Sequence, residues 1–541
     1  MKNFSKFNFK KYHLFIVLIL ALIFRLYGLN WDQNQHLHPD ERFLTMVTQA
    51  VKLPSVDPYE AGYDFFVYGT LPLTIVKIVS SFVIIDKLDY NNITLVGRIV
   101  STFFDLGVVF LIYKISENIF DKKIGLLAAF FYSISVLPIQ LSHFYAVDTF
   151  LNFFIVLSFY ILVSLIISKQ LANSLVLNTL LGIALGLSLA SKISSVLFIP
   201  VIFLGLLFKS LKEKKLLFSA YCLVPIVFFA YFSLRFVDPH VFTNQFVENL
   251  KQLKSFDNPN GYFPPAIQWI KIKPIIFPLK NMVLWGLGLP LGILAILGVF
   301  NLAIVLIREF RQSNNLTVRQ LSSLLILFWI LFLFFYQGVQ FSKAMRYFLP
   351  IYPFLAIIAA NFFQSIVKSK LFRVVCYVLF LIYPLSFLAI YSRPHSRVTA
   401  SDWIYKNIPP GSTLSCEHWD DCLPLSLEQK NHTLYNIETL ALYDPDTPQK
   451  WQKINSQLEN IDYLVMSSNR LWGSIPIVPE KYPIASKFYK DLFDEKLDFK
   501  KVAEITSYPT IPVLNISIPD DLADETFTVY DHPKVLIYKK V

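Results

Sequence analysis

Charged residues are scarce in this sequence. Lys, Arg, Asp and Glu together account for 16% of its 541 residues, whereas 55% are hydrophobic and 16% are aromatic. A soluble protein of this composition would expose a largely apolar surface, so the composition excludes a soluble protein. Apolar runs of about 18–22 residues, each long enough to cross a bilayer core of roughly 30 Å, recur between residues 12 and 390. The sequence therefore predicts a polytopic membrane protein.

Several motifs of enzyme chemistry are also absent. The sequence has no Walker loop, no glycine-rich dinucleotide turn, no His-Glu-x-x-His pair and no Gly-x-Ser-x-Gly elbow. A reaction driven by ATP through a recognisable fold is therefore not expected. The formal net charge of +11 comes mainly from lysines in short loops between apolar runs, so no nucleic acid partner is expected either.

Cysteine is scarce, with four residues in the whole chain. Cys222 and Cys376 lie in apolar runs and read as core residues. Cys416 and Cys422 flank a polar loop, where a disulfide is expected if the loop is extracytoplasmic. Zinc binding by this pair with His418 is the alternative, although the spacing matches no common zinc site.

Lysine and arginine recur in alternate loops between the apolar runs, from Lys2–Lys11 through Lys209–Lys215 to Lys368–Arg373. Positive residues are enriched on the cytoplasmic side of membrane proteins, so this bias orients the chain. It predicts a multi-pass plasma-membrane protein with a cytoplasmic N-terminus. Residues 1–390 are expected to form an all-α membrane bundle of about eleven transmembrane helices.

The outer side of this bundle is expected to carry one long early loop. The first span, at about 12–29, and the second, at about 94–115, enclose two surface helices near 40–51 and 71–85. A third span, at about 124–139, leads outward again. The outer loops are therefore long enough to form a site.

The tail after the bundle changes character. Residues 391–541 combine a helical pattern at 447–460 with strand-like runs at 463–466 and 535–539. This mixture predicts a soluble, extracytoplasmic α/β domain.

The unusual polar residues of the membrane region fall at the outer ends of predicted helices. Ionisable groups gathered at one face of a membrane bundle are candidates for function. They are His38, Asp40, Glu41, Arg42, His143, Asp148, Lys192, Lys343, Arg346 and Tyr347.

Asp40, Glu41 and Asp148 are the candidate catalytic residues. A carboxylate within reach of an attacking hydroxyl can accept its proton. The like charge of Glu41 and partial desolvation are expected to raise the pKa of Asp40 toward a useful range. The same Pro39-Asp40-Glu41 run is also a favoured helix start, because acidic residues stabilise the first turn.

The cationic residues predict a phosphate site. Arg346 can bind a phosphate through two N–H donors, and Lys192 can add a second positive charge. His38, Arg42, His143, Lys343 and Tyr347 complete the predicted substrate-binding set. Snorkelling toward lipid headgroups is the alternative for the cations. No cofactor is required, and a divalent metal held by Asp40 and Asp148 is left open.

Arg98 and Asp105 lie seven residues apart and therefore on one face of a predicted helix. An internal polar network that supports the bundle is the expected role of this pair.

These motifs resemble the GT-C superfamily of membrane glycosyltransferases, and more narrowly its protein O-mannosyltransferase and lipid A aminoarabinose transferase branch. In that branch a Pro-Asp-Glu motif is followed by Arg and an aromatic residue, which matches Pro39–Phe43. A second aspartate matches Asp148, and an Arg-Tyr…Pro…Pro run matches Arg346–Pro353. The resemblance covers roughly residues 10–390.

The resemblance implies a polyprenyl-phosphate sugar as donor, in contact with membrane lipid, and a glycan, lipid or protein acceptor. The donor phosphate would lie near Arg346 and Lys192, and Asp40 would deprotonate an acceptor hydroxyl that attacks with inversion. The chain lacks the inserted sensing domain of eukaryotic O-mannosyltransferases, so a protein acceptor is not implied. The C-terminal domain is not part of the resemblance, and the choice of acceptor is expected to depend on it.

Two other functions stay open. An oligosaccharyltransferase shares the GT-C frame but would need a metal and a Trp-Asp motif, of which Trp419-Asp420-Asp421 is a short echo. A transporter or flippase for lipid-linked sugars would show broken helices and charges near the membrane midplane.

Overall fold

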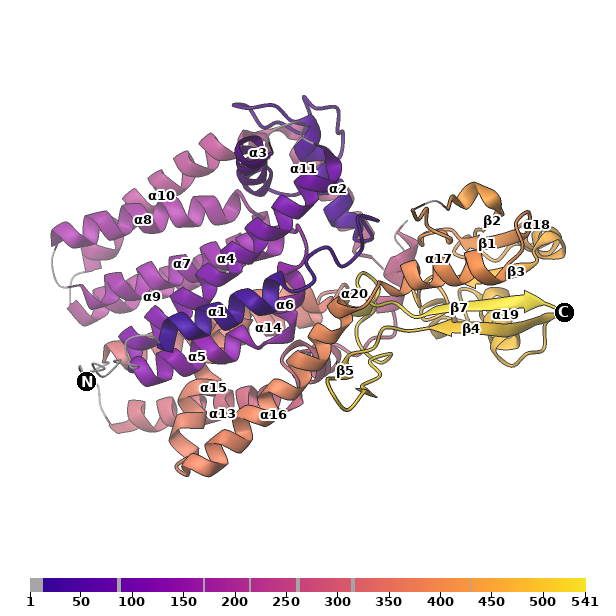
Figure 1. Ribbon diagram of the computed structural model, residues 1–541. Helices are drawn as coiled ribbons and strands as arrows, with labels where there is room; N and C mark the ends of the chain where they lie inside the picture. Colours follow the sequence, from indigo (N-terminus) through magenta and orange to yellow (C-terminus); the bar gives the residue numbers. More distant parts are fainter. Residues whose placement is uncertain are drawn as a thin grey trace, which may run out of the picture.

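The computed structural model in Figure 1 describes residues 13–84, 89–168, 171–213, 216–258, 263–312, 317–428 and 430–541. Several basic residues used above to orient the chain lie outside the described residues: Lys2–Lys11, Lys214 and Lys215. A bundle of long helices forms one part of the molecule, and an α/β domain is attached at one end of it (Figure 1).

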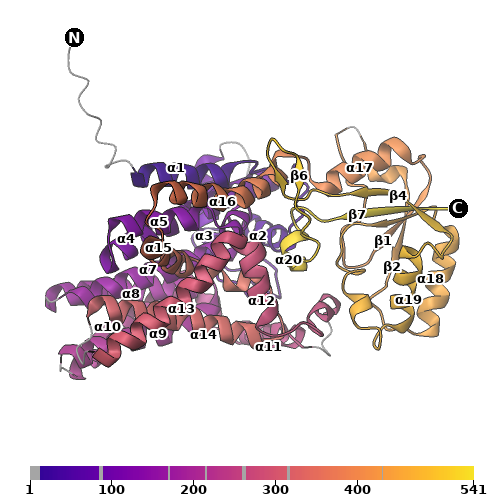
Figure 2. The same ribbon diagram turned by 90° about the horizontal axis from the view of Figure 1, so that it is seen from below.

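The membrane bundle is built of apolar helices that run roughly side by side in both views (Figures 1 and 2). Their bounds are α1 (His13–Leu26), α4 (Tyr90–Ile119), α5 (Lys122–Ser133), α6 (Val136–Ser142), α7 (Val147–Ile167), α8 (Leu171–Leu189), α9 (Ile199–Glu213), α10 (Leu216–Val237), α13 (Leu289–Gln312), α14 (Val318–Val339), α15 (Tyr352–Ile366) and α16 (Lys370–Leu388).

Membrane-crossing length separates these helices into two groups. Among the described residues, seven helical segments are long and apolar enough to cross a membrane, or eight if the bent pair α5–α6 is one span. The shorter apolar helices α1, α8 and α10 lie in the same bundle (Figure 1). This arrangement agrees with the predicted polytopic all-α bundle.

The third predicted span, 124–139, is not straight. It is divided into α5 and α6, which are bent by 60°. Pro138 has no N–H to donate to the carbonyl of Ile134, so the helix breaks between Ser133 and Val136. The bend places the short helix α6 and the loop after it at the end of the bundle that faces the C-terminal domain.

Short helices cover that end of the bundle. Two of them, α2 (Pro39–Ala50) and α3 (Leu71–Val83), are the predicted surface helices. The others are η2 (Ile193–Phe198), η3 (Pro239–Phe242), α11 (Asn244–Phe256), η4 (Pro264–Trp269), α12 (Ile276–Asn281), η5 (Met282–Gly286), η6 (Met345–Ile351) and η7 (Ala389–Ser392).

The C-terminal domain is a five-stranded sheet with helices on both faces. The strand order is β2-β1-β3-β7-β4, in which β1 is parallel to β2 and β3, and β7 is antiparallel to β3 and β4. The elements are α17 (Ser396–Asn407), β1 (Thr413–Glu417), η8 (His432–Leu434), β2 (Asn436–Leu440), α18 (Pro448–Asn460), β3 (Tyr463–Met466), η9 (Ile475–Ile477), α19 (Pro483–Phe493), β4 (Phe499–Ile505), β5 (Thr510–Ile511), β6 (Ile516–Ser517), α20 (Glu525–Thr528) and β7 (Val535–Lys540).

The strand runs recognised in the sequence are the centre of this sheet. All four residues of β3 are buried, as are the first four of β7. Ile454 and Tyr489 from α18 and α19 pack on one face, while Ala400 and Ile404 from α17 pack on the other. A strand covered on both faces reads as a continuous apolar run, which is why these two runs were visible in the sequence.

One part of the C-terminal domain returns to the bundle. Between β4 and β7 the chain forms the β5–β6 hairpin and then α20, which lie between the sheet and the helices in Figure 1. The end of the bundle and the C-terminal domain therefore share a surface.

Candidate active site

Asp40 lies at the start of α2, where the sequence produces a strong helix N-terminus. His38 is the N-cap and its Nδ1 accepts the backbone N–H of Glu41 at 3.3 Å, and Pro39 takes the first helical position. The carboxylates of the first turn are favoured by the helix dipole. The prediction of a helix start at Pro39-Asp40-Glu41 is therefore correct. The start of this helix also directs Asp40 toward the end of the bundle.

Asp40 is paired with Arg346. The Arg346 Nη1 donates to Asp40 Oδ2 at 2.5 Å, and the two side chains are 20% and 25% exposed. Burial by itself would raise the pKa of Asp40, but the adjacent guanidinium outweighs it and holds this pKa well below its usual range. The predicted upward shift is wrong for this state, because it considered the neighbouring carboxylate and not the arginine.

Asp148 and Lys192 form a second pair beside the first. The Lys192 Nζ lies 2.9 Å from Asp148 Oδ1. The Tyr347 ring joins the pairs, with its centroid 5.3 Å from Lys192 Nζ and 5.5 Å from Arg346 Cζ. We refer to Asp40, Arg346, Asp148, Lys192 and Tyr347 as the outer ion-pair cluster. The predicted members from α2, α7, η2 and η6 do come together.

Two tyrosines beside this cluster carried no signal in the sequence. Burial and, to a smaller extent, the Asp40 carboxylate raise the pKa of Tyr68 well above its usual range. Tyr530, from the C-terminal domain, is likewise buried near Arg346 and Asp40. Tyr68 lies among other aromatic residues of the outer loop, and Tyr530 is far away in the chain, so residue type alone could not single them out.

Glu41 lies away from the cluster, although it was predicted to be catalytic. Its carboxylate accepts Arg98 Nε at 2.8 Å, Arg98 Nη2 at 2.6 Å and the backbone N–H of Tyr145 at 2.8 Å. Arg98 also donates to Asp32 at 2.9 Å. These three side chains are at most 1% exposed. We refer to Asp32, Glu41 and Arg98 as the inner ion-pair layer, which holds the bundle end together rather than facing a substrate.

A further buried pair lies in the bundle. Asp105 accepts Arg25 Nε at 2.5 Å and the Tyr132 hydroxyl at 2.5 Å, and both ionic side chains are fully buried. Arg98 and Asp105 thus belong to two internal networks joined by α4. Both residues are buried inside the bundle, as expected, but in separate networks, and the partner of Asp105 is Arg25, which no sequence motif indicated.

Three residues of the predicted substrate-binding set have structural partners instead. Arg42 Nη1 donates to Asp421 of the C-terminal domain at 3.0 Å. His143 is buried between the carbonyl oxygens of Ile139 and Tyr27, and stacks on Tyr391 with ring centroids 4.0 Å apart. Lys343 is also buried, and its Nζ donates to the carbonyl of Phe341 at 2.8 Å.

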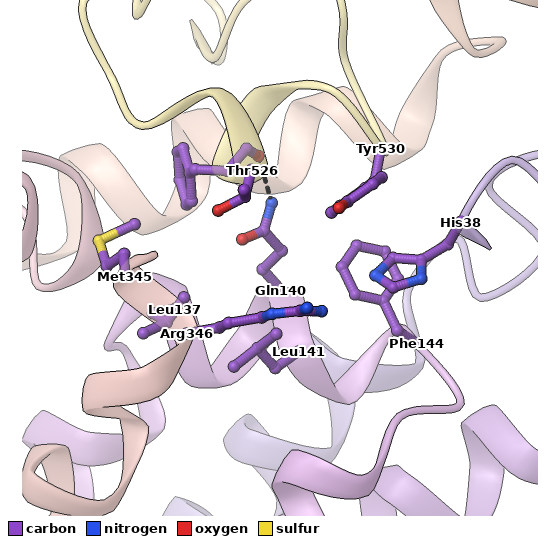
Figure 3. Close-up of a pocket in the computed structure, with 10 residues that line it drawn as sticks. His38, Leu137, Gln140, Leu141, Phe144, Met345, Arg346, Thr526 and Tyr530 are labelled. Atoms are coloured by element: carbon purple, nitrogen blue, oxygen red, sulfur yellow. Dashed lines mark hydrogen bonds between the residues drawn. The ribbon is translucent and has the colours of Figure 1, made fainter. Parts of the chain in front are cut away.

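A small hollow lies next to Arg346, where α2, α6, η6 and α20 meet (Figure 3). His38 and Phe144 line one side, and Gln140 and Tyr530 reach toward its centre (Figure 3). The remaining lining residues are Leu137, Leu141, Met345, Thr526 and Phe527. The hollow connects the outer ion-pair cluster with the C-terminal domain.

The carboxylates of the cluster do not form a metal site. Within the described ranges, no group of three or more His, Cys, Asp or Glu side chains could hold a metal ion. Asp40 and Asp148 are each engaged by a cation. The donor set therefore does not fit a divalent metal in this arrangement.

The polar loop of the C-terminal domain is closed by a disulfide between Cys416 and Cys422. Zinc binding through these sulfurs is thereby set aside. Within this loop Asp420 and Asp421 accept Arg397 at 2.7 and 2.6 Å. The segment Trp419-Asp420-Asp421, which partly matches the Trp-Asp motif of oligosaccharyltransferases, is therefore engaged in ion pairs. One of them, between Asp421 and Arg42, joins the C-terminal domain to the bundle.

Comparison with known proteins connects this arrangement to glycosyl transfer. Residues 87–235 match the model of the dolichyl-phosphate-mannose-protein mannosyltransferase family. No protein among those with curated descriptions matches the sequence.

Solved structures share the fold at low sequence identity. The apo oligosaccharyltransferase of Archaeoglobus fulgidus superimposes with a TM-score of 0.53 and 14% identity, over 89% of this chain and 73% of that chain. The same enzyme, AglB, in complex with an inhibitory peptide and a dolichol-phosphate gives 0.53 and 13%, over 90% and 73%. ArnT from Cupriavidus metallidurans bound to undecaprenyl phosphate is similar over 98% of each chain, with 12% identity and a TM-score of 0.47.

The fold of the archaeal enzyme extends over the bundle and into the C-terminal domain, whereas the family match covers α4 to α10. The chain thus shares the fold of the archaeal oligosaccharyltransferase, and residues 87–235 resemble a mannosyltransferase family, which favours a multi-pass membrane glycosyltransferase over a transporter.

Proposed function

We propose that this protein transfers a glycosyl group from a polyprenyl-phosphate donor to an acceptor hydroxyl at the outer face of the membrane, with Asp40 as the base. The observation that carries the proposal is the 2.5 Å contact between Asp40 and Arg346. It brings a proton acceptor next to a side chain suited to phosphate.

Arg346 and Lys192 would bind the donor phosphate. Both cations are now paired with carboxylates, but their side chains are about one-fifth exposed, so the phosphodiester anion of the donor can compete for them. Arginine has five N–H donors and can hold the phosphate while it still touches Asp40. The neighbouring Tyr347 ring limits where the two cations can lie. AglB, which shares the fold, has been solved with a dolichol-phosphate.

The reaction itself would be a single displacement. Asp40 takes the proton of the acceptor hydroxyl while the oxygen bonds to the anomeric carbon, and the bond from that carbon to the phosphate oxygen breaks. The electron pair leaves with the polyprenyl phosphate, whose charge Arg346 and Lys192 stabilise. No general acid is needed for such a leaving group, and attack from the opposite face inverts the anomeric centre.

Donor binding would also activate the base. Arg346 holds the pKa of Asp40 low in the donor-free protein. Once phosphate takes part of the guanidinium charge, the pKa of Asp40 rises toward its usual range, and the carboxylate becomes a better proton acceptor. The base would therefore gain strength when the donor is present.

The predicted orientation supports an extracytoplasmic reaction. The outer ion-pair cluster and the C-terminal domain lie at the same end of the bundle (Figure 1). The basic loops of the sequence fall at the opposite helix ends, which favours a cytoplasmic N-terminus.

The test is transfer of labelled sugar from dolichyl- or undecaprenyl-phosphate mannose to a membrane extract by wild type, Asp40→Asn and the control Asp402→Asn. Asp402 lies on the exposed surface of α17 and pairs with Lys406. We expect transfer by wild type and control and its loss in Asp40→Asn, with donor binding retained and an inverted anomer in the product. Equal transfer by all three proteins would remove Asp40 from the chemistry.

The fold shared with AglB makes transfer to a peptide amide the second candidate. It is tested by adding a peptide that contains the NVT sequon, since AglB has been solved tethered to such an acceptor. Label on the peptide instead of the membrane extract would favour an oligosaccharyltransferase.

A further inference from the structure

The C-terminal domain supplies part of the wall next to the candidate base. Thr526 and Phe527 of α20, with Tyr530 just after it, line the hollow that Arg346 and His38 line from the bundle (Figure 3). The soluble domain therefore contributes side chains to the site itself.

This part of the domain is held on the bundle by specific contacts. Asp524 accepts the backbone N–H of Met345 at 2.7 Å, and its own N–H donates to Asn281 at 2.8 Å. Gln140 Nε2 donates to the carbonyl of Phe527 at 2.7 Å. Because Met345 directly precedes Arg346, the position of α20 is tied to the residue proposed to bind phosphate.

The hollow has both apolar and polar walls. Leu141, Phe144 and Met345 supply apolar contacts. The Tyr530 hydroxyl and the Gln140 side-chain carbonyl have no hydrogen-bond partner within the described part of the chain, although both residues are buried. Buried polar groups are normally paired, so these two atoms are available to a ligand. A sugar ring, with C–H faces and hydroxyl edges, has matching chemistry.

The charges around the hollow favour a neutral ligand. Asp531 is engaged by Gln140 and Tyr391, at 3.0 and 2.8 Å. Glu525 is paired with Arg470 at 2.9 Å. The guanidinium of Arg346 points into the hollow (Figure 3). With the carboxylates around it already paired, the hollow offers no free acidic group from the described residues to an ammonium group.

We propose that Tyr530 and Gln140 recognise the hydroxyls of a neutral hexosyl or pentosyl group on the donor, and that the C-terminal domain thereby selects the sugar. This inference rests on the proposed function. Tyr530 and Gln140 bind the group to be transferred, and the base and phosphate ligands remain those of the outer ion-pair cluster.

The hollow is narrow in this structure. Its cavity of about 10 Å³ has room for one water molecule. A sugar therefore needs a wider hollow, and a movement of α20 away from η6 that breaks the contact between Asp524 and Met345 would provide it. Closure around the bound sugar would then exclude water from the anomeric carbon.

The experiment compares Tyr530→Phe with the control Tyr508→Phe, whose hydroxyl bonds Asp521 outside the hollow. Each is assayed as full-length protein with polyprenyl-phosphate mannose, its monodeoxy analogues and a polyprenyl-phosphate aminosugar. We expect wild type and control to disfavour one deoxy analogue about tenfold, and Tyr530→Phe to lose that discrimination for that analogue alone. The aminosugar should be the poorest donor for all three proteins.

Hydrogen exchange of residues 518–532 with and without polyprenyl-phosphate mannose gives a second measurement. Protection of this segment by the donor in wild type, weakened in Tyr530→Phe, is expected. Unchanged discrimination among donors and unchanged exchange would overturn this inference alone. If wild type transfers sugar from no polyprenyl-phosphate donor, the proposed function fails and the inference fails with it.

Discussion

Asp40 and Glu41 are consecutive residues on α2, and each pairs with an arginine, yet the two pairs lie in different surroundings. Asp40 and Arg346 in the outer ion-pair cluster are 25% and 20% exposed, whereas Glu41 and Arg98 in the inner ion-pair layer are at most 1% exposed. A helix turns by about 100° per residue, so neighbouring side chains point to different sides. The same residue types therefore serve two purposes.

The difference shows what makes an ion pair available for function. A partly exposed pair has few other partners, and an incoming anion can replace one of its members. A fully buried pair is removed from water and held by several hydrogen bonds. Removing one member leaves the other charge buried without a partner, which destabilises the folded protein. Access and exchangeability, rather than residue type, distinguish the candidate site from its support.

The largest expected effect is on catalysis. Asp40→Asn should lower the transfer rate by about 10²- to 10⁴-fold, because it removes the proton acceptor, while the melting temperature changes little. The matched substitution Glu41→Gln should lower the melting temperature, because it weakens the pairing with Arg98. Transfer rates and thermal unfolding in detergent measure both. Equal loss of rate at unchanged stability in the two variants would erase the distinction between cluster and layer.

Arg98→Met should destabilise the protein by about 3–5 kcal/mol, because it leaves Glu41 and Asp32 buried without their cation. Arg346→Met removes a cation from the outer cluster and should change stability far less. Thermal unfolding and yield in the membrane compare the two. A stable, well-expressed Arg98→Met protein would contradict the structural role of the inner layer.

Arg346→Lys keeps the positive charge but loses the planar pair of donors. We expect the donor KM to rise about tenfold with a smaller change in kcat, because phosphate binding weakens more than the chemical step. Kinetics over a range of donor concentrations separate the two constants. A variant with unchanged donor KM would show that charge alone suffices at this position.

The last prediction concerns Glu417, a buried carboxyl with no ion pair among the described residues. Burial raises the pKa of Glu417 to about 8 from 4.5, and Tyr489 donates to it at 2.5 Å. The folded state therefore binds a proton more tightly than the unfolded state, and stability is lost as pH rises from about 4.5 through about 8. Glu417→Gln should melt higher than wild type at pH 9 and similarly at pH 5, with the exposed Glu459→Gln as control. A Glu417→Gln protein that shows the wild-type pH dependence would assign that dependence to other groups.

Much of the architecture could be predicted because it depends on periodicity and composition. The apolar runs, the two surface helices, the acidic start of α2 and the central strands of the C-terminal sheet are local features. The outer ion-pair cluster could also be predicted. The distribution of Lys and Arg assigns each loop to one side of the membrane, and residues at the helix ends on that side meet at one face of the bundle.

The predictions that failed concern the direction in which a side chain points and the partners that it meets from distant parts of the chain. Whether Asp40 or Glu41 faces the candidate site depends on how α2 packs against α4. Arg98 lies on α4 and pairs with the carboxylate that points toward that helix, which is Glu41. Arg42 and Asp421 lie far apart in the chain, and nothing local connects them. Tyr530 reaches the site only because α20 returns to the bundle.

The sequence by itself determined that this chain enters a membrane, carries an α/β domain and gathers opposite charges at one end, because hydrophobicity and charge act residue by residue. Tertiary structure alone decided which carboxylate is buried, which arginine holds the candidate base, and that the C-terminal domain forms one wall of the site. Those outcomes depend on the packing of segments distant in the chain, and a shift of one residue along a helix would reverse them.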